Sequence, residues 1–185
     1  MINRWVLPAC RCRVEEYLRQ EEKRQRREKK ARIERLFANS GLGPRFSGCT
    51  FGNWIKRRGT EEAYKIAFEY AENISENISS GKGFLIFGNP GNGKSHLAAA
   101  VVNTALLRKG YTAIFERVPK LLAKIRATYQ GWEFTEHQIM KTLTDADLLV
   151  LDDAGAEKWT EWTEPTIYTI IDERYTHNKA LIVTT

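Results

Sequence analysis

The feature that most constrains the fold is a glycine-rich loop of eight residues. Residues 88–95 read Gly-Asn-Pro-Gly-Asn-Gly-Lys-Ser and fit G-x-x-x-x-G-K-[ST] at every fixed position. The apolar run Phe84–Phe87 precedes the loop, and a helical pattern over Ser95–Arg108 follows it and is closed by Gly110. A loop between a buried strand and a helix can curl its N–H groups around one anion, which the helix dipole also attracts. The sequence therefore predicts a phosphate-binding site.

The loop residues have separate expected roles toward ATP. Lys94 is expected to bridge the β- and γ-phosphates as a catalytic cation, and the Ser95 hydroxyl to bind Mg²⁺. The expected nucleotide-binding residues are Gly88, Asn89, Pro90, Gly91, Asn92, Gly93, Lys94, Ser95 and His96.

A second chemical signal follows the apolar run Leu148–Leu151, which ends in Asp152 and Asp153. In open α/β sheets, residues at the carboxyl ends of the strands face the ligand. We expect Asp152 to hold Mg²⁺ and Asp153 to orient or deprotonate the attacking water. The alternative is a strand-end turn with two capping acids, which the nearby loop 88–95 makes the weaker interpretation.

Helical and strand patterns alternate from Thr60 onward, which predicts an α/β fold with a parallel sheet and flanking helices. Thr60 is expected to cap the first of these helices, which Ser79–Gly83 interrupts. Further helices are expected over Pro119–Gln130, His137–Leu143 and Glu164–Tyr175, and further strands over Thr112–Val118 and Leu181–Val183. A strand and a helix separate the loop from the acidic strand, and no guanine-reading N-K-x-D segment is present. Both observations argue against a small GTPase.

The positive charge is concentrated near the N-terminus. The chain has a formal net charge of +6, and residues 11–35 hold eleven Lys/Arg and six Glu. We expect residues 1–38 to form a charged helical segment, 39–59 a lead-in segment and 60–185 a partial ATPase core. The basic segment fits either a solvated connecting helix or an arm that contacts nucleic-acid phosphates.

The cysteine count and hydropathy limit the class of protein. Three cysteines argue against a disulfide framework, and Cys10 and Cys12 supply only two of the four ligands of a structural zinc. They are either free thiols or the remnant of a zinc-binding domain. No apolar stretch approaches the ~20 residues that cross a bilayer, and no secretory signal is evident. We expect a cytoplasmic protein that does not associate with membranes.

Several further motifs carry a family resemblance over about residues 45–185. They are Arg45-Phe46, Thr50-Phe51-x-Asn53, Asp147–Glu157 (DLLVLDDAGAE), Arg174-Tyr175 and Leu181–Thr185. With the glycine-rich loop, they resemble AAA+ ATPases of the DnaC/DnaI replicative helicase-loader group, with IstB-type transposition ATPases closely related. The resemblance implies an AAA+ P-loop fold, ATP and Mg²⁺, a replicative helicase as partner, and a role in DNA replication. It also raises single-stranded DNA and a second copy of the chain as further partners.

The resemblance also defines what the sequence does not contain. The family's sensor 1 residue, fifth strand, arginine finger and sensor 2 lid are expected beyond Thr185, so we expect a fragment or truncated product with weak ATPase activity. Without a fifth strand, Phe84–Phe87 is expected to be an exposed apolar edge. Asp153 stands where many AAA+ proteins have Glu, which predicts slow hydrolysis. The alternatives are an IstB-like transposition helper and a non-hydrolysing ATP-binding interaction module; a small-molecule kinase is disfavoured because no acceptor site or lid is evident.

Two side-chain groups have alternative interpretations. Lys120, Lys124, Arg126 and Tyr129 share a helix that either contacts single-stranded DNA or is solvated. Trp159 and Trp162 either pack against the core or form a docking face.

Overall fold

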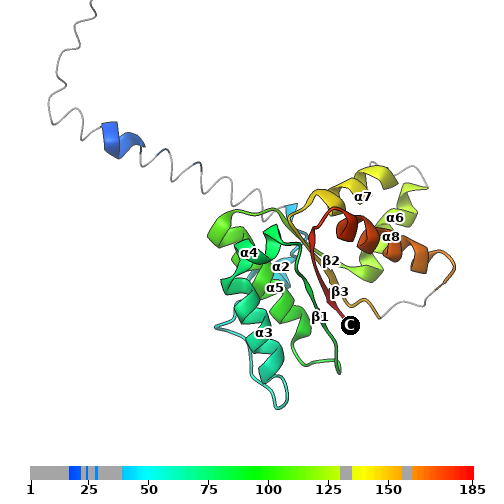
Figure 1. The fold of residues 1–185 in the computed structure, drawn as a ribbon, viewed down its shortest axis with the longest axis horizontal. Helices are drawn as coiled ribbons and strands as arrows, with labels where there is room; N and C mark the ends of the chain where they lie inside the picture. Colours follow the sequence, from blue (N-terminus) through cyan, green and yellow to red (C-terminus); the bar gives the residue numbers. More distant parts are fainter. Residues whose placement is uncertain (1–16, 22–23, 25–27, 29–38, 130–134, 156–159) are drawn as a thin grey trace, which may run out of the picture.

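The computed structural model describes residues 17–21, 24, 28, 39–129, 135–155 and 160–185 (Figure 1). Its centre is a four-stranded parallel sheet in the order β1-β4-β3-β2. The strands are β1 (Phe84–Ile86), β2 (Ala113–Arg117), β3 (Leu148–Asp152) and β4 (Ala180–Thr184). The predicted parallel α/β fold is confirmed.

Helices cover both faces of the sheet (Figure 1). On one face lie α2 (Pro44–Ser47), α3 (Glu61–Glu72), α4 (Ile74–Ser79), α5 (Lys94–Thr104) and the π-helical turn η1 (Ala105–Lys109). On the other lie α6 (Val118–Thr128), α7 (Glu136–Asp145) and α8 (Thr163–Thr176). Each face therefore has its own apolar cluster, separated by the sheet.

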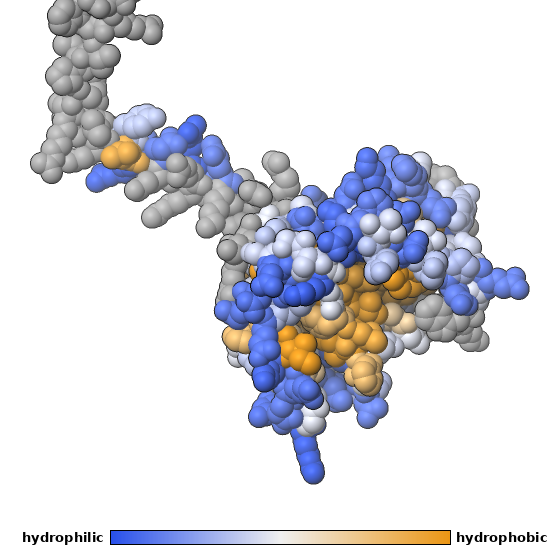
Figure 2. Space-filling view, viewed as in Figure 1, coloured by the Kyte–Doolittle hydropathy of each residue, from blue (hydrophilic) through white to orange (hydrophobic). Residues whose placement is uncertain are grey.

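The burial of each strand follows its place in the sheet. Every residue of β3 is buried, because strands pair with it on both sides and helices cover both of its faces. In the described chain β1 pairs with β4 alone, and beside its free edge Leu85 is 57% and Phe87 77% exposed. Figure 2 shows apolar residues gathered on the face that carries β1. The predicted apolar edge is therefore exposed at Leu85 and Phe87, whereas Phe84 is partly buried and Ile86 is buried.

Helix α5 is the most deeply buried helix of the domain. All residues from Leu97 to Asn103 are buried, as expected for a helix that is apolar on every side. The Asn103 amide donates to the carbonyls of Phe46 (3.0 Å) and Cys49 (2.7 Å), which ties the lead-in segment to α5. Because α5 follows the glycine-rich loop directly, the loop is anchored to the core at its C-terminal end.

The structure corrects some local predictions. The Thr60 hydroxyl does not cap α3; it donates to the Arg57 carbonyl at 2.6 Å and accepts from the Arg57 N–H at 3.2 Å. Helix α7 begins at Glu136, earlier than predicted, because Thr135 and Gln138 form a reciprocal capping box.

The basic N-terminal segment is described only in part. Most of the basic segment 1–38, including Cys10 and Cys12, lies outside them; Cys49 is a free, buried thiol. No helix in the described ranges combines the length and apolarity that a membrane span requires.

A buried arginine ties α8 to the rest of the domain. The Arg174 guanidinium is fully buried and donates to backbone carbonyls at the end of α7, in the two residues before β3 and at the start of β4. Burial lowers the pKa of Arg174 to about 10, while the nearby Asp147 and Tyr70 act in the opposite direction. The side chain is still charged at neutral pH, so its carbonyl partners are essential to its burial.

We predict that Arg174→Met lowers the free energy of unfolding by at least about 3 kcal/mol, because it leaves several buried carbonyls without a donor. Arg58→Met, at an exposed loop position, is the matched control and should change it by less than about 0.5 kcal/mol. Urea unfolding measures both. Similar values for the two variants would contradict the role assigned to Arg174.

Candidate functional site

The sheet order brings three separate segments to one edge. The glycine-rich loop follows β1. Asp152 ends β3, and Asp153 follows it. Thr184 ends β4, which lies between β1 and β3. Because all strands are parallel, their carboxyl ends meet at this edge. Residues from distant parts of the sequence therefore line one site.

The loop backbone adopts conformations that favour glycine. Gly88, Gly91 and Gly93 have φ values of 144°, 85° and 81°. A Cβ at Gly93 would also lie 2.7 Å from Nε1 of Trp54, a side chain of the lead-in segment. Close packing against Trp54 and a left-handed backbone thus both require glycine at the start of α5.

Lys94 lies against the loop that precedes it. Its ammonium donates to the carbonyls of Gly88 at 2.6 Å and Asn89 at 3.0 Å. A phosphate bound in the loop would compete with these two carbonyls for the same ammonium protons.

The two acids are held by a threonine from the neighbouring strand. The Thr184 hydroxyl donates to Oδ1 of Asp152 at 2.7 Å and accepts from the N–H of Asp153 at 3.0 Å. Asp152 is 1% exposed, whereas Asp153 is partly exposed and has φ 63°, rare for a residue with a side chain. Thr184 thus positions the buried carboxylate and the backbone of the exposed one.

An arginine from β2 completes this group. Arg117 donates from Nη2 to Oδ2 of Asp153 at 2.9 Å, and its Nε lies 3.9 Å from Oδ2 of Asp152. Its side chain is 55% exposed, so solvent weakens the ion pair. Neither Arg117 nor Thr184 was predicted as a site residue. Each ends a strand of the same parallel sheet, and Thr184 also lies in the Leu181–Thr185 motif that carries the family resemblance.

A cavity of about 530 Å³ joins these groups. Its lining includes the loop from Pro90 to His96, both acids and their partners Thr184 and Arg117, and the lead-in side chains Arg45, Cys49, Trp54 and Arg57. Gly88 and Asn89 are not among the lining residues and instead accept from Lys94. Nε2 of His96 lies 2.9 Å from the Thr50 carbonyl, so this ring also contacts the lead-in segment.

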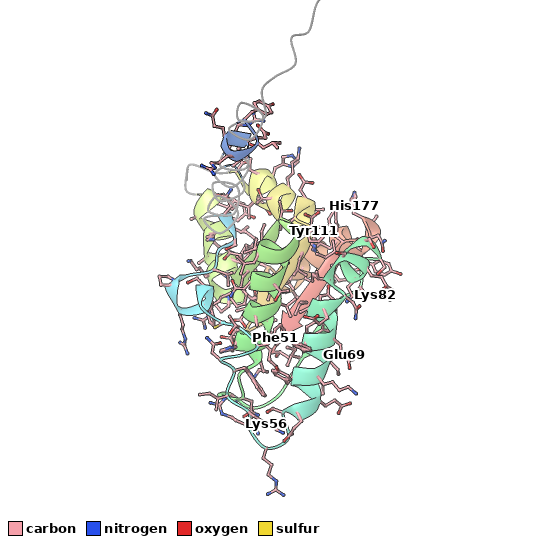
Figure 3. All side chains as sticks on the ribbon, turned by 90° about the vertical axis from the view of Figure 1, so that its left-hand side faces the viewer. Phe51, Lys56, Glu69, Lys82, Tyr111 and His177 are labelled. Atoms are coloured by element: carbon pink, nitrogen blue, oxygen red, sulfur yellow. The ribbon has the colours of Figure 1, made fainter. Side chains whose placement is uncertain are left out.

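The lead-in segment reaches the cavity through an aromatic cluster. Phe51 makes edge contacts with Tyr64 and Phe68 of α3, and Trp54 lies 5.1 Å from the Tyr64 ring, centroid to centroid. Figure 3 shows Phe51 near α3 and α5, with Lys56 farther out on the same segment. This packing fixes Trp54 beside the glycine-rich loop.

The residues that line the cavity fit a nucleoside triphosphate with Mg²⁺. The cations Lys94, Arg45, Arg57 and Arg117 line the cavity and complement a polyanion. Asp152 and Ser95 line it as well and offer oxygen ligands of the kind that Mg²⁺ prefers. Within the described residues no group of three or more His, Cys, Asp or Glu side chains could hold a metal ion. A Mg²⁺ ion here would therefore need phosphate oxygens and water as further ligands.

Most side chains of the α6 face considered for contact with single-stranded DNA are bound to other residues of the protein. Lys124 pairs with Glu116, the Arg126 guanidinium lies 4.5 Å from the centre of the Trp162 ring, and the Tyr129 hydroxyl donates to Glu136. Trp162 packs against the apolar cluster of α6–α8, and Trp159 lies outside the described residues. These contacts favour a structural role for most of this face.

Comparison with known proteins agrees with this geometry. The family described as IstB-like ATP binding protein matches residues 70–185. The chain belongs to this family of IstB-like ATP-binding proteins. The family match includes the glycine-rich loop, both acids and Thr184, so the central parts of the site lie in the shared region.

Relatives and solved structures confirm the predicted resemblance to helicase loaders. The chain is 32% identical to the replicative helicase loader DnaC of Escherichia coli (strain K12) over 151 residues. This match covers 81% of the chain and 60% of DnaC, so the chain spans about 60% of that relative's length.

The solved structures give the same fold. A crystal structure of the DnaC helicase loader matches with a TM-score of 0.68 and 28% identity over 77% of this chain and 79% of that one. AMPPCP-bound DnaA from Aquifex aeolicus matches with a TM-score of 0.64 and 26% identity over 78% of this chain and 43% of DnaA. The predicted AAA+ P-loop fold is thereby confirmed.

We predict that Gly93→Ala destabilises the domain by about 2–3 kcal/mol, since it combines backbone strain with a clash against Trp54. Gly91→Ala is the matched control, because its φ is similar but a Cβ there meets nothing within 4 Å. Its cost should be only about 1 kcal/mol. Urea unfolding of each variant with and without Trp54→Ala separates the backbone strain from the clash with Trp54. If Trp54→Ala relieves neither variant, or both equally, the proposed packing is wrong.

Proposed function

We propose that this chain binds ATP with Mg²⁺ in the cavity of the glycine-rich loop and hydrolyses it slowly to ADP and phosphate. The main support for this proposal is that the loop and the buried carboxylate of Asp152 line one cavity at the same edge of a parallel sheet. Membership of a family of ATP-binding proteins supports ATP as the nucleotide. The related DnaA structure is bound to AMPPCP, an ATP analogue, which points the same way.

Each residue has a defined task in this proposal. Lys94 and the first N–H groups of α5 bind the phosphates, and Ser95 and Asp152 hold Mg²⁺, which neutralises phosphate charge when bound. Asp153 orients a water molecule for attack on the γ-phosphorus. As the new P–O bond forms, the bond to the β–γ bridging oxygen breaks, and the water proton passes to the carboxylate. The shorter Asp side chain at this position favours slow turnover.

We further propose that the chain acts as a DnaC-like helicase loader in DNA replication, with a hexameric replicative helicase as partner. The 32% identity to DnaC over 81% of the chain supports this assignment. It implies a cytoplasmic protein that can contact single-stranded DNA and further copies of itself. The match to the IstB-like family favours a second candidate, a helper ATPase in transposition.

We predict that Lys94→Ala lowers affinity for fluorescent ATP at least about 100-fold, because the loop loses its only side-chain cation. Lys82→Ala, an exposed position outside the cavity lining, should bind like the wild type. Asp153→Asn should bind ATP but lose turnover, whereas a non-hydrolysing module would show no turnover even in the wild type. Unchanged binding by Lys94→Ala would remove the phosphate-site assignment.

We predict that the immobilised full chain with Mg·ATP retains a replicative helicase hexamer in a pull-down of purified proteins. The same resin should not retain an IS21-type transposase. The reverse preference would favour the transposition helper, and Lys94→Ala shows whether retention depends on nucleotide.

A further inference from the structure

The lead-in segment follows one face of α5. Gly93, His96 and Asn103 of α5 and its N-cap contact the segment, and they lie three and seven residues apart, the spacing of one helix face. Their partners, in the order in which they approach the glycine-rich loop, are Phe46 and Cys49, then Thr50, then Trp54. The segment therefore runs antiparallel to α5 and ends beside the loop.

The middle contact comes from the side chain that follows Ser95. Nε2 of His96 lies 2.9 Å from the Thr50 carbonyl, and because a carbonyl oxygen only accepts, Nε2 carries the proton. Thr50 is locked to Asn53: its N–H donates to Oδ1 of Asn53 at 2.8 Å, and its Oγ1 accepts from the Asn53 N–H at 3.2 Å. The Asn53 amide also donates to the Gly48 carbonyl at 2.8 Å. His96 thus holds a whole hydrogen-bonded turn against α5.

This turn and the residues after it form one wall of the nucleotide cavity. The glycine-rich loop and the two acids line the part assigned to the phosphates and Mg²⁺. Lead-in residues line the rest, among them Cys49, Trp54 and Ile55, whose apolar surfaces suit the flat face of a base. A triphosphate bound at the loop therefore leaves its base and ribose to this lead-in wall.

We propose that His96 is a positioning residue that holds the lead-in wall in place and so sets the affinity for the nucleoside part of ATP. His96 was predicted to bind the nucleotide itself; it acts instead through the Thr50 carbonyl. Loss of this hydrogen bond loosens the wall but leaves the loop and the acids in place. Nucleoside binding then weakens while phosphate binding persists. The inference rests on the proposed binding of ATP.

The test compares two ligands that share the phosphate chain but differ in the nucleoside. Mg·ATP and inorganic tripolyphosphate with Mg²⁺ each compete with fluorescent ATP for the full chain, which gives two dissociation constants per variant. His96→Ala should weaken ATP binding about 5- to 10-fold, the equivalent of one hydrogen bond, and change tripolyphosphate binding less than about 2-fold. His96→Gln keeps an N–H donor and should recover most of the ATP affinity.

His137→Ala is the matched control, because His137 lies on α7 and outside the cavity lining. It should bind both ligands like the wild type.

Thr50→Val tests the other end of the contact. It keeps the shape of the side chain but removes the hydroxyl that accepts from Asn53, and Thr50 itself does not line the cavity. ATP binding should weaken about 3-fold, again without loss of tripolyphosphate binding. In a His96→Ala background the further loss should be smaller, because both changes loosen the same wall. If His96→Ala fails to fold, Thr50→Val carries the same comparison of ligands.

The other outcomes overturn the inference. Equal losses of ATP and tripolyphosphate affinity in His96→Ala would make His96 part of the phosphate site. If His96→Gln bound ATP as weakly as His96→Ala, the hydrogen bond to Thr50 would not be the link. If tripolyphosphate did not compete in the wild type, or if all variants bound ATP equally well, the inference would fail and the ATP site would stand. Absence of ATP binding by the wild type would overturn both.

Discussion

The position of β4 between β1 and β3 determines how the site is assembled. It separates the glycine-rich loop from the acidic strand and places the Thr184 hydroxyl against Asp152 and the Asp153 backbone. A carboxylate as buried as Asp152 requires such a donor, because an unpaired charge inside a protein is costly. The sheet topology thus creates a stable position for an acid that faces the phosphate-binding loop.

Packing around the sheet holds this arrangement from both sides. Helix α5 anchors the loop to one apolar cluster, and Asn103 ties the lead-in segment to the same helix. On the opposite face, Arg174 joins α8 to the end of α7, to the Ala146 carbonyl just before β3 and to the start of β4. Site residues therefore project from elements that are fixed independently of the site.

The sequence predicted the parts of the site that consist of adjacent residues. The loop 88–95 and the Asp152-Asp153 pair are local patterns, and the alternation of helices and strands predicts that they meet at one edge. Arg117 and Thr184 could not be assigned in this way, because their roles depend on which strands become neighbours. The order of strands in a sheet depends on non-local packing, which residue patterns along one sequence do not reveal.

Contacts of individual side chains explain the smaller differences between the predicted and the observed structure. The start of α7 was readable from the Thr135 and Gln138 capping box, which the periodicity of apolar residues alone did not reveal. Thr60 has the residue type of an N-cap, yet its hydroxyl is engaged by Arg57 in the preceding turn. Trp54 joined the site through an aromatic cluster whose members come from both the lead-in segment and α3. Such contacts depend on the folded chain rather than on sequence spacing.

We propose above all that the cavity beside Lys94 binds a magnesium nucleotide. Isothermal titration of the full chain with ATP tests it most directly, first with Mg²⁺ and then with the metal chelated. We predict one binding event per chain with a Kd between about 1 µM and 1 mM, and weaker binding once the metal is removed. If the folded chain bound no ATP under either condition, the cavity would not be a nucleotide site.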